Sequence, residues 1–237
     1  MSIVSANMQA VELAIQTAAE AAGRPRSAIQ LLAVSKTFPF TAVLDAMQTG
    51  QRAFGENYLQ EGVDKIAAVA AAAPSEQLEW HFIGPIQSNK TRPIAENFAW
   101  VHAIDRLKIA QRLAEQRPEG LPPLNVCLQV NISGEDSKSG VAPADLPELA
   151  HQVAALPHLR LRGLMAIPEA ESDAAKQHLP FARLRLLYEQ LQADGLPLDT
   201  LSMGMSGDLA AAVAEGATIV RIGSAIFGAR TYPKDAA

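Results

Sequence analysis

The sequence predicts an α/β protein, built as a single (β/α)8 TIM barrel with an additional N-terminal helix. Short apolar runs rich in β-branched residues recur along the chain, and a longer helical pattern follows each of them. About eight such runs are present, which is the number that closes a parallel barrel. The 237 residues suit one barrel or two smaller domains, but no change of composition marks a linker. We therefore expect one domain that spans residues 1–237.

The expected elements alternate in a regular order. An amphipathic helix over 5–22 precedes the first strand. Strands are expected at 31–34, 51–55, 80–83, 100–103, 126–130, 161–166, 200–203 and 219–222. The helices between them are expected at 41–49, 60–73, 87–97, 107–116, 147–156, 174–193 and 208–215. Gly50, Gly195 and Gly216 stand where a helix ends before the next strand, and glycine tolerates the positive φ that such an end requires.

The overall composition excludes several classes of protein. Hydrophobic residues make up 49% of the chain and charged residues 19%, which is typical of a globular protein rather than a disordered one. The net charge is −5 with acidic and basic residues interleaved, so we expect no nucleic-acid partner. The longest apolar run, 66–73, is far shorter than the roughly 20 residues that cross a membrane. Cys127 is the only cysteine, which excludes an internal disulfide and favours a cytoplasmic location.

Lys36 is the first candidate functional residue. It follows the apolar strand expected at 31–34, and the functional groups of a parallel barrel lie at the C-terminal ends of its strands. An amine beside a low-dielectric core has its charged form disfavoured, which lowers its pKa and makes it a nucleophile toward carbonyls. Schiff-base chemistry is one consequence. A solvated lysine that ends a strand is the alternative, and this feature by itself favours the alternative.

Two neighbouring strand ends carry residues suited to binding phosphate. The run Gly204 to Asp208 follows the seventh strand and opens a helix, and Gly223 and Ser224 follow the eighth strand. Backbone N–H groups at such turns bind anions, and a phosphate between strands seven and eight recurs in these barrels. An N-cap serine with a turn glycine explains either run alone. Their coincidence at adjacent strands favours phosphate.

Arg221 lies on the last strand beside this phosphate site. A structural ion pair would explain it, and so would a hydrogen bond to the ring nitrogen of a bound pyridine, because a guanidinium donates without giving up its proton. Such a contact would keep the ring nitrogen unprotonated and make the cofactor a weaker electron sink. His81 and His102 lie within strands, where a hydrogen-bonded core role fits them better than a functional one. The histidines lack the spacing of a metal site, so no metal is expected.

Several long runs resemble the pyridoxal phosphate homeostasis family (YggS/PROSC/PLPBP). Together they are distributed over almost the whole chain. The runs are LAVSKT at 32–37, FGENY at 54–58, WHFIGPIQSNK at 80–90, QVNI at 129–132, GLMAIP at 163–168, LSMGMSGD at 201–208 and VRIGSAIFG at 220–228.

The resemblance implies a barrel similar to the N-terminal domain of bacterial alanine racemase, with pyridoxal 5′-phosphate (PLP) as the cofactor. It implies that Lys36 holds PLP covalently as a Schiff base. It also implies that Ser206, Gly223 and Ser224 bind the phosphate and that Arg221 lies near the pyridine nitrogen.

Further positions match residues around the cofactor in this family. The resemblance implies that five more residues line it: Asn57, His81, Ile83, Met165 and Met203. Lys138, in the loop 133–140, matches a family lysine that helps to transfer or exchange the cofactor.

The function that the resemblance implies is intracellular PLP homeostasis without robust catalytic activity, with apo-PLP enzymes as recipients of the cofactor. The alternative is a fold-type III PLP-dependent racemase or decarboxylase with weak activity. Racemisation needs a second acid/base on the opposite face of the cofactor, which alanine racemase obtains from an additional domain. The chain ends soon after its eighth strand, so we expect no such domain.

Two other functions receive less support. A lysine-dependent aldolase shares the Schiff base, but its lysine is expected on a later strand than that of Lys36. A non-enzymatic scaffold role stays open, because a sequence does not report partners. We expect a monomer, since no large apolar patch is evident at the barrel rim.

Overall fold

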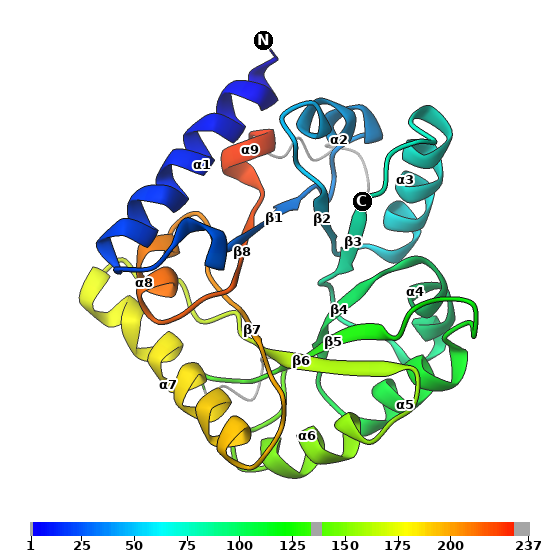
Figure 1. The fold of residues 1–237 in the computed structure, drawn as a ribbon, viewed down its shortest axis with the longest axis vertical. Coiled ribbons are helices and arrows are strands. Elements are labelled where there is room, and N and C mark those ends of the chain that lie inside the picture. Colours follow the sequence, from blue (N-terminus) through cyan, green and yellow to red (C-terminus); the bar gives the residue numbers. More distant parts are fainter. Residues whose placement is uncertain (1, 134–138, 230–237) are drawn as a thin grey trace, which may run out of the picture.

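Parallel strands form a closed barrel in the structure, a computed structural model that describes residues 2–133 and 139–229. The strands follow one another around the barrel in chain order, and β8 pairs with β1 to close it (Figure 1). They are β1 Gln30–Val34, β2 Ala53–Glu56, β3 Glu79–Phe82, β4 Trp100–Ile104, β5 Leu124–Gln129, β6 Leu159–Met165, β7 Thr200–Ser202 and β8 Ile219–Ile222. The predicted (β/α)8 barrel is confirmed.

Helices surround the barrel on its outer side (Figure 1). They are α1 Ile3–Ala21, α2 Phe40–Met47, α3 Leu59–Ala72, α4 Thr91–Asn97, α5 Leu107–Gln116, α6 Leu146–Ala154, α7 Ala174–Ala193, α8 Leu209–Ala214 and α9 Ser224–Phe227, with short 3-10 turns η1 Arg26–Ala28 and η2 Ser88–Lys90. The helix expected at 87–97 is divided into η2 and α4. The short helix α9 was not expected. The three glycines expected at positive φ have φ values of 94°, 92° and 99°.

The N-terminal helix α1 supports the part of the barrel that follows β7 and β8. Its buried residues lie on one face of the helix, where Ala18 and Ala19 follow Ile15 at three and four residues: Met8, Val11, Ile15, Ala18 and Ala19. Asn7 Nδ2 donates to the carbonyl oxygen of Ile226 in α9 at 2.8 Å, and Arg24 Nη1 donates to that of Val213 in α8 at 2.7 Å. The additional helix and the segment directly after it therefore hold α8 and α9, which start at the predicted phosphate site.

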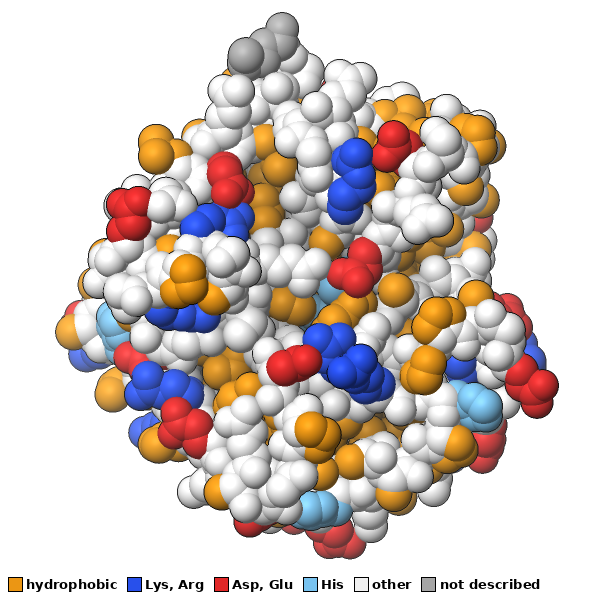
Figure 2. All heavy atoms as spheres, in the orientation of Figure 1, with side chains coloured by type: hydrophobic (Ala, Val, Ile, Leu, Met, Phe, Trp, Pro, Cys, Tyr) orange, Lys and Arg blue, Asp and Glu red, His pale blue; other side chains and the backbone are white. Residues whose placement is uncertain are grey.

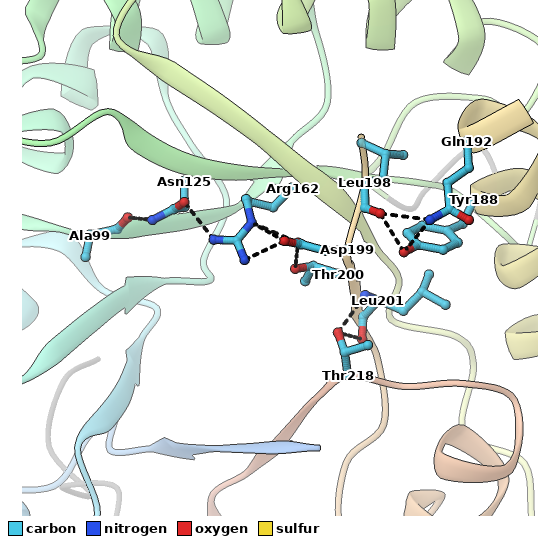
Figure 3. Close-up of polar contacts among 10 residues, drawn as sticks. All are labelled: Ala99, Asn125, Arg162, Tyr188, Gln192, Leu198, Asp199, Thr200, Leu201 and Thr218. Carbon is cyan, nitrogen blue, oxygen red and sulfur yellow. Dashed lines mark hydrogen bonds and ion pairs between the residues drawn. The ribbon is translucent and has the colours of Figure 1, made fainter. Parts of the chain in front are cut away.

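Polar side chains join neighbouring strands at the N-terminal end of the barrel (Figure 3). Arg162 of β6 donates from Nε to Asp199 Oδ1 at 2.8 Å and from Nη1 to Asn125 Oδ1 of β5 at 2.9 Å. Its guanidinium also lies 4.6 Å from the centroid of the Trp100 ring, a cation–π distance. These contacts link β4, β5, β6 and the residue before β7 at the end where barrels carry stability rather than function.

The surface in Figure 2 carries charges of both signs. Lys and Arg side chains lie beside Asp and Glu on that face, without an extended area of one sign. This arrangement agrees with the interleaved charges of the sequence. In the described part of the chain, no helix combines the length and the apolar character that crossing a membrane requires.

Candidate functional site

A cavity of about 280 Å³ opens at the C-terminal ends of β1 and β8. Its volume is close to the lower limit of small-molecule sites, which is about 300 Å³. Seven of the ten residues expected around the cofactor line it: Lys36, Asn57, Ile83, Ser206, Arg221, Gly223 and Ser224. Four further residues complete the wall: Val34, Ile167, Met205 and Gly207. The fold thus brings residues that are far apart in the sequence around one space.

Three residues expected around the cofactor lie in the interior instead. His81, Met165 and Met203 are fully buried and are not among the lining residues of the cavity. They lie on β3, at the end of β6 and just after β7. In this structure their side chains are part of the buried barrel interior. Lys138 lies outside the described residues.

Lys36 lies just after the C-terminal end of β1. This is the position predicted from the sequence, because the functional groups of a parallel barrel lie at the C-terminal ends of its strands. The strand before it is buried from Leu31 to Val34, because both of its faces are covered by the barrel interior and the outer helices. Lys36 itself is half-buried and its side chain lines the cavity. The position of Lys36 after a buried strand therefore places its side-chain amine beside the cavity, at the edge of the apolar core.

Turns after β7 and β8 supply the polar end of the cavity. Ser206, Gly207 and Ser224 are exposed at its rim. Within the described residues, no hydrogen bond engages the backbone N–H of Ser206 or Gly207. Asp208 Oδ1 accepts the N–H of Met205 at 2.5 Å and fixes the turn. Uncommitted N–H groups beside serine hydroxyls form a site for a phosphate.

Arg221 brings a buried cation to the cavity wall from β8. Its Nη1 donates to Ser202 Oγ at 2.9 Å, and its Nη2 donates to the carbonyl oxygen of Ala166 at 2.9 Å. Burial lowers the pKa of the Arg221 guanidinium to about 10, which leaves it protonated at neutral pH. Its contacts are with neutral oxygens, so no carboxylate neutralises it at contact distance among the described residues. The orientation of the guanidinium is therefore set by the barrel before any ligand binds.

Asn57 lines the cavity and carries an acceptor without a partner among the described residues. This acceptor, Oδ1, is buried. A buried polar atom without a partner is rare in proteins, and a ligand that donates a hydrogen bond there would satisfy it. Together with the amine, the cation and the N–H groups, this acceptor fits a small aromatic aldehyde that bears a phosphate.

A chain of hydrogen bonds runs through the barrel interior below the cavity. Glu79 Oε1 lies 2.9 Å from His81 Nε2, His81 Nδ1 lies 2.8 Å from His102 Nε2, and His102 Nδ1 lies 2.7 Å from Ser202 Oγ. Ser202 in turn contacts Arg221. Both ring nitrogens of each histidine therefore have protein partners, as expected of core histidines.

Burial lowers the pKa of His81 and lowers the pKa of His102 well below its ordinary value, so both rings bind protons less readily in the folded protein than in the unfolded chain. The unfolded chain binds protons at these histidines below about pH 6.5. Stability must therefore fall as the pH decreases from that value.

We predict a loss of about 1 kcal/mol from His102 alone between about pH 6.5 and pH 5.5, from the linkage of proton binding to folding. Urea unfolding of the wild type and of His102→Asn at both pH values measures it, and the variant should lose about 1 kcal/mol less than the wild type. His151→Gln, at an exposed histidine, is the matched control and should follow the wild type. Equal losses in the wild type and His102→Asn would contradict the prediction.

Two further kinds of reactive group bear on the chemistry of the described residues: the thiol of Cys127 as a nucleophile, and clusters of side chains that could bind a metal ion. Cys127 is buried and reduced, and burial raises the pKa of its thiol to about 12, which makes it a poor nucleophile. Among residues 2–133 and 139–229, no group of three or more His, Cys, Asp or Glu side chains could hold a metal ion. The chemistry of the site therefore rests on Lys36 and on the ligand that it meets.

Known proteins share both the sequence and the fold. The family "Alanine racemase, N-terminal domain" matches residues 6–231. The Pyridoxal phosphate homeostasis protein of Pseudomonas aeruginosa is 64% identical over 98% of each chain. The protein of the same name in Escherichia coli K12 is 54% identical over 99% of this chain and 100% of its own. The structure of PipY from Synechococcus elongatus with PLP bound is 36% identical, with a TM-score of 0.81 over 95% of this chain and 100% of PipY.

Proposed function

The chain belongs to the pyridoxal phosphate homeostasis protein family, and we propose that it holds PLP as a Schiff base on Lys36. Family membership confirms the resemblance found in the sequence motifs. The protein binds PLP and takes part in PLP homeostasis, without robust catalytic activity. One observation carries the proposed site: a single cavity is lined by an amine, a buried guanidinium and exposed serines on two adjacent turns.

Each end of the cavity has a different role in the proposed complex. The N–H groups of Ser206 and Gly207, with the hydroxyl of Ser224, bind the phosphate. Arg221 donates a hydrogen bond to the ring nitrogen, and Asn57 accepts one from the bound cofactor. Ile83 supplies apolar contact, and three buried side chains support the site from the interior: His81, Met165 and Met203. The chemistry that PLP supplies when bound is an aldehyde that reacts with amines.

The electrostatics of the cavity favour a carrier over an enzyme. Among the residues that line it, Lys36 and Arg221 are the ones with ionisable side chains. Arg221 does not give up its proton at neutral pH, so it leaves the ring nitrogen without one and weakens the ring as an electron sink. Tyr58 and Tyr232 are the candidate second bases. Tyr58 is 50% exposed and lines a neighbouring cavity instead, and Tyr232 lies outside the described residues. A two-base racemisation therefore lacks its second base in the described wall.

The proposal extends to the cellular role. We infer that residues 1–237 act as one PLP-binding domain and as a monomer. We also infer a cytoplasmic location, because the reducing cytoplasm keeps a thiol such as that of Cys127 reduced. Apo-enzymes that require PLP are the proposed recipients. Lys138 is proposed to help transfer the cofactor to them.

The test of this function is an exchange assay on the PLP-loaded protein. The protein is incubated with a panel of amino acids in deuterated water, and deuterium at the α-carbon is measured by mass spectrometry. We expect no more exchange than free PLP produces, because the described residues that line the cavity include no second base. A parallel sample is reduced with borohydride and digested, and the PLP should be found on the Lys36 peptide. Exchange at the turnover of an enzyme would favour a racemase or decarboxylase instead.

A further inference from the structure

A cluster of charged side chains, two of them buried, contacts the backbone around Lys36. Its members are Glu56 at the end of β2 and two residues of α3, Glu61 and Lys65. Lys65 Nζ lies 2.6 Å from Glu56 Oε1 and 2.9 Å from Glu61 Oε1. The side chain of Lys65 is 4% exposed and that of Glu56 is fully buried, whereas that of Glu61 is 32% exposed. We refer to these three residues as the acidic clamp.

The acidic clamp holds the peptide group on each side of Lys36. Before Lys36, the carbonyl oxygen of Ser35 accepts a hydrogen bond from Lys65 Nζ at 2.8 Å, and the Ser35 hydroxyl donates to Glu56 Oε1 at 2.6 Å. After Lys36, the backbone N–H of Thr37 donates to Glu61 Oε1 at 2.6 Å. Lys36 is therefore flanked on both sides by backbone that charged side chains fix in place.

The arrangement satisfies the ammonium group completely. Lys65 has three N–H donors, and it meets three acceptors: the carbonyl oxygen of Ser35 and one oxygen each of Glu56 and Glu61. Burying these charges is costly, and a hydrophobic set of similar volume often stabilises a fold as well or better. The clamp is thus poorly explained by stability alone, and its directed contacts with residues 35 and 37 suggest a role in positioning.

The backbone at Thr37 needs such support. Its φ angle is 68°, in the left-handed region that a β-branched residue rarely adopts. Conformations of this kind persist only where the surroundings hold them, and they gather at ligand sites. The hydrogen bond to Glu61 acts on this residue directly.

We propose that the acidic clamp positions Lys36 for attack on the PLP aldehyde by fixing the peptide groups at Ser35 and Thr37. In this step the neutral amine of Lys36 forms a C=N bond with the aldehyde carbon, and the aldehyde oxygen leaves as water with the two amine protons. This inference rests on the proposed function of Lys36. Glu56, Glu61 and Lys65 act through the backbone and do not line the cavity. They are positioning residues for the covalent step.

Substitution of Glu61 tests the proposal, because this residue is partly exposed and its loss leaves the Glu56–Lys65 pair intact. Glu61→Ala removes the acceptor of the Thr37 N–H, and Glu61→Gln keeps an oxygen there. We expect Glu61→Ala to slow the formation of the visible Schiff-base band on mixing with PLP by about tenfold, the effect of losing one hydrogen bond to a charged group. Glu61→Gln should recover most of the rate. Glu96→Ala, which breaks a surface pair with Arg92 on α4, should match the wild type.

Hydrogen exchange of the apo-protein gives a readout that does not depend on PLP. The amide of Thr37 should lose protection in Glu61→Ala and keep it in Glu61→Gln, while the melting temperatures of both stay near that of the wild type. A wild-type rate in Glu61→Ala, or equal losses in the two variants, would overturn the positioning role. A wild type that takes up no PLP on Lys36 would instead refute the proposed function, and the positioning role with it.

Discussion

Lys36→Ala is expected to lose all of the PLP that borohydride fixes to the wild-type protein. The variant lacks the amine that the cavity offers to an aldehyde, and the remaining lining residues form no covalent bond with it. The fold should persist, since Lys36 is half-buried and stands after β1 rather than within it. Mass spectrometry of the reduced, denatured protein measures the bound PLP. A weaker, reversible association through Ser206, Ser224 and Arg221 should remain and should be visible by equilibrium dialysis.

The chain offers a matched control for this experiment. Lys90 is exposed and lines the neighbouring cavity rather than the proposed site, so Lys90→Ala should take up PLP as the wild type does. Reduced PLP found on another lysine of Lys36→Ala, with the absorbance band of the wild type, would refute Lys36 as the attachment point. Loss of PLP in both variants would show that the effect does not depend on the position of the lysine.

The fold was predictable from the sequence because its signals are local. A buried strand such as β1 shows as a continuous apolar run, and an amphipathic helix such as α5 shows a helical period, so the order of the strands and of the longer helices followed directly. The departures fall on short elements. The four residues of α9 are too few to show a period, and η2 breaks the helical pattern between Ser88 and Lys90 without a sequence signal that distinguishes it.

The site residues that directly follow a strand could be predicted from the sequence. Lys36, Ser206 and Gly223 follow strands, and a barrel places all strand ends of one sense on the same rim. The sequence did not reveal the acidic clamp, because charged residues beside an apolar strand are normally predicted to be exposed to solvent. The contact of Lys65 with Ser35 depends on how α3 packs against β1 and β2, which no local pattern reports. The signal available was the position of Glu56 as the last residue of a strand buried along its whole length.

Gly84→Ala is expected to destabilise the protein and to weaken PLP binding together. A Cβ atom at position 84 would lie 2.1 Å from the carbonyl oxygen of Asn57 and 2.8 Å from its Cα atom. Both contacts are with backbone, so the chain around Asn57 must move rather than a flexible side chain. We expect a loss of about 3 kcal/mol, at the upper end of overpacking costs. For a chain of this length the melting temperature should fall by roughly 6–12 °C.

The same displacement moves Asn57, which lines the cavity, and this separates the variant from an ordinary destabilised one. Gly163→Ala provides the comparison, because its Cβ would lie 1.7 Å from the carbonyl oxygen of Thr200, at the start of β7 and away from the cavity. Both variants should have a lower melting temperature than the wild type. Of the two, only folded Gly84→Ala should bind PLP more weakly than the wild type does. Gly120→Ala, whose Cβ would meet nothing within 4 Å, should match the wild type in both respects. Wild-type PLP affinity in folded Gly84→Ala would mean that Asn57 does not touch the cofactor, and the cavity would then hold PLP through Lys36, Arg221 and the phosphate turns without it.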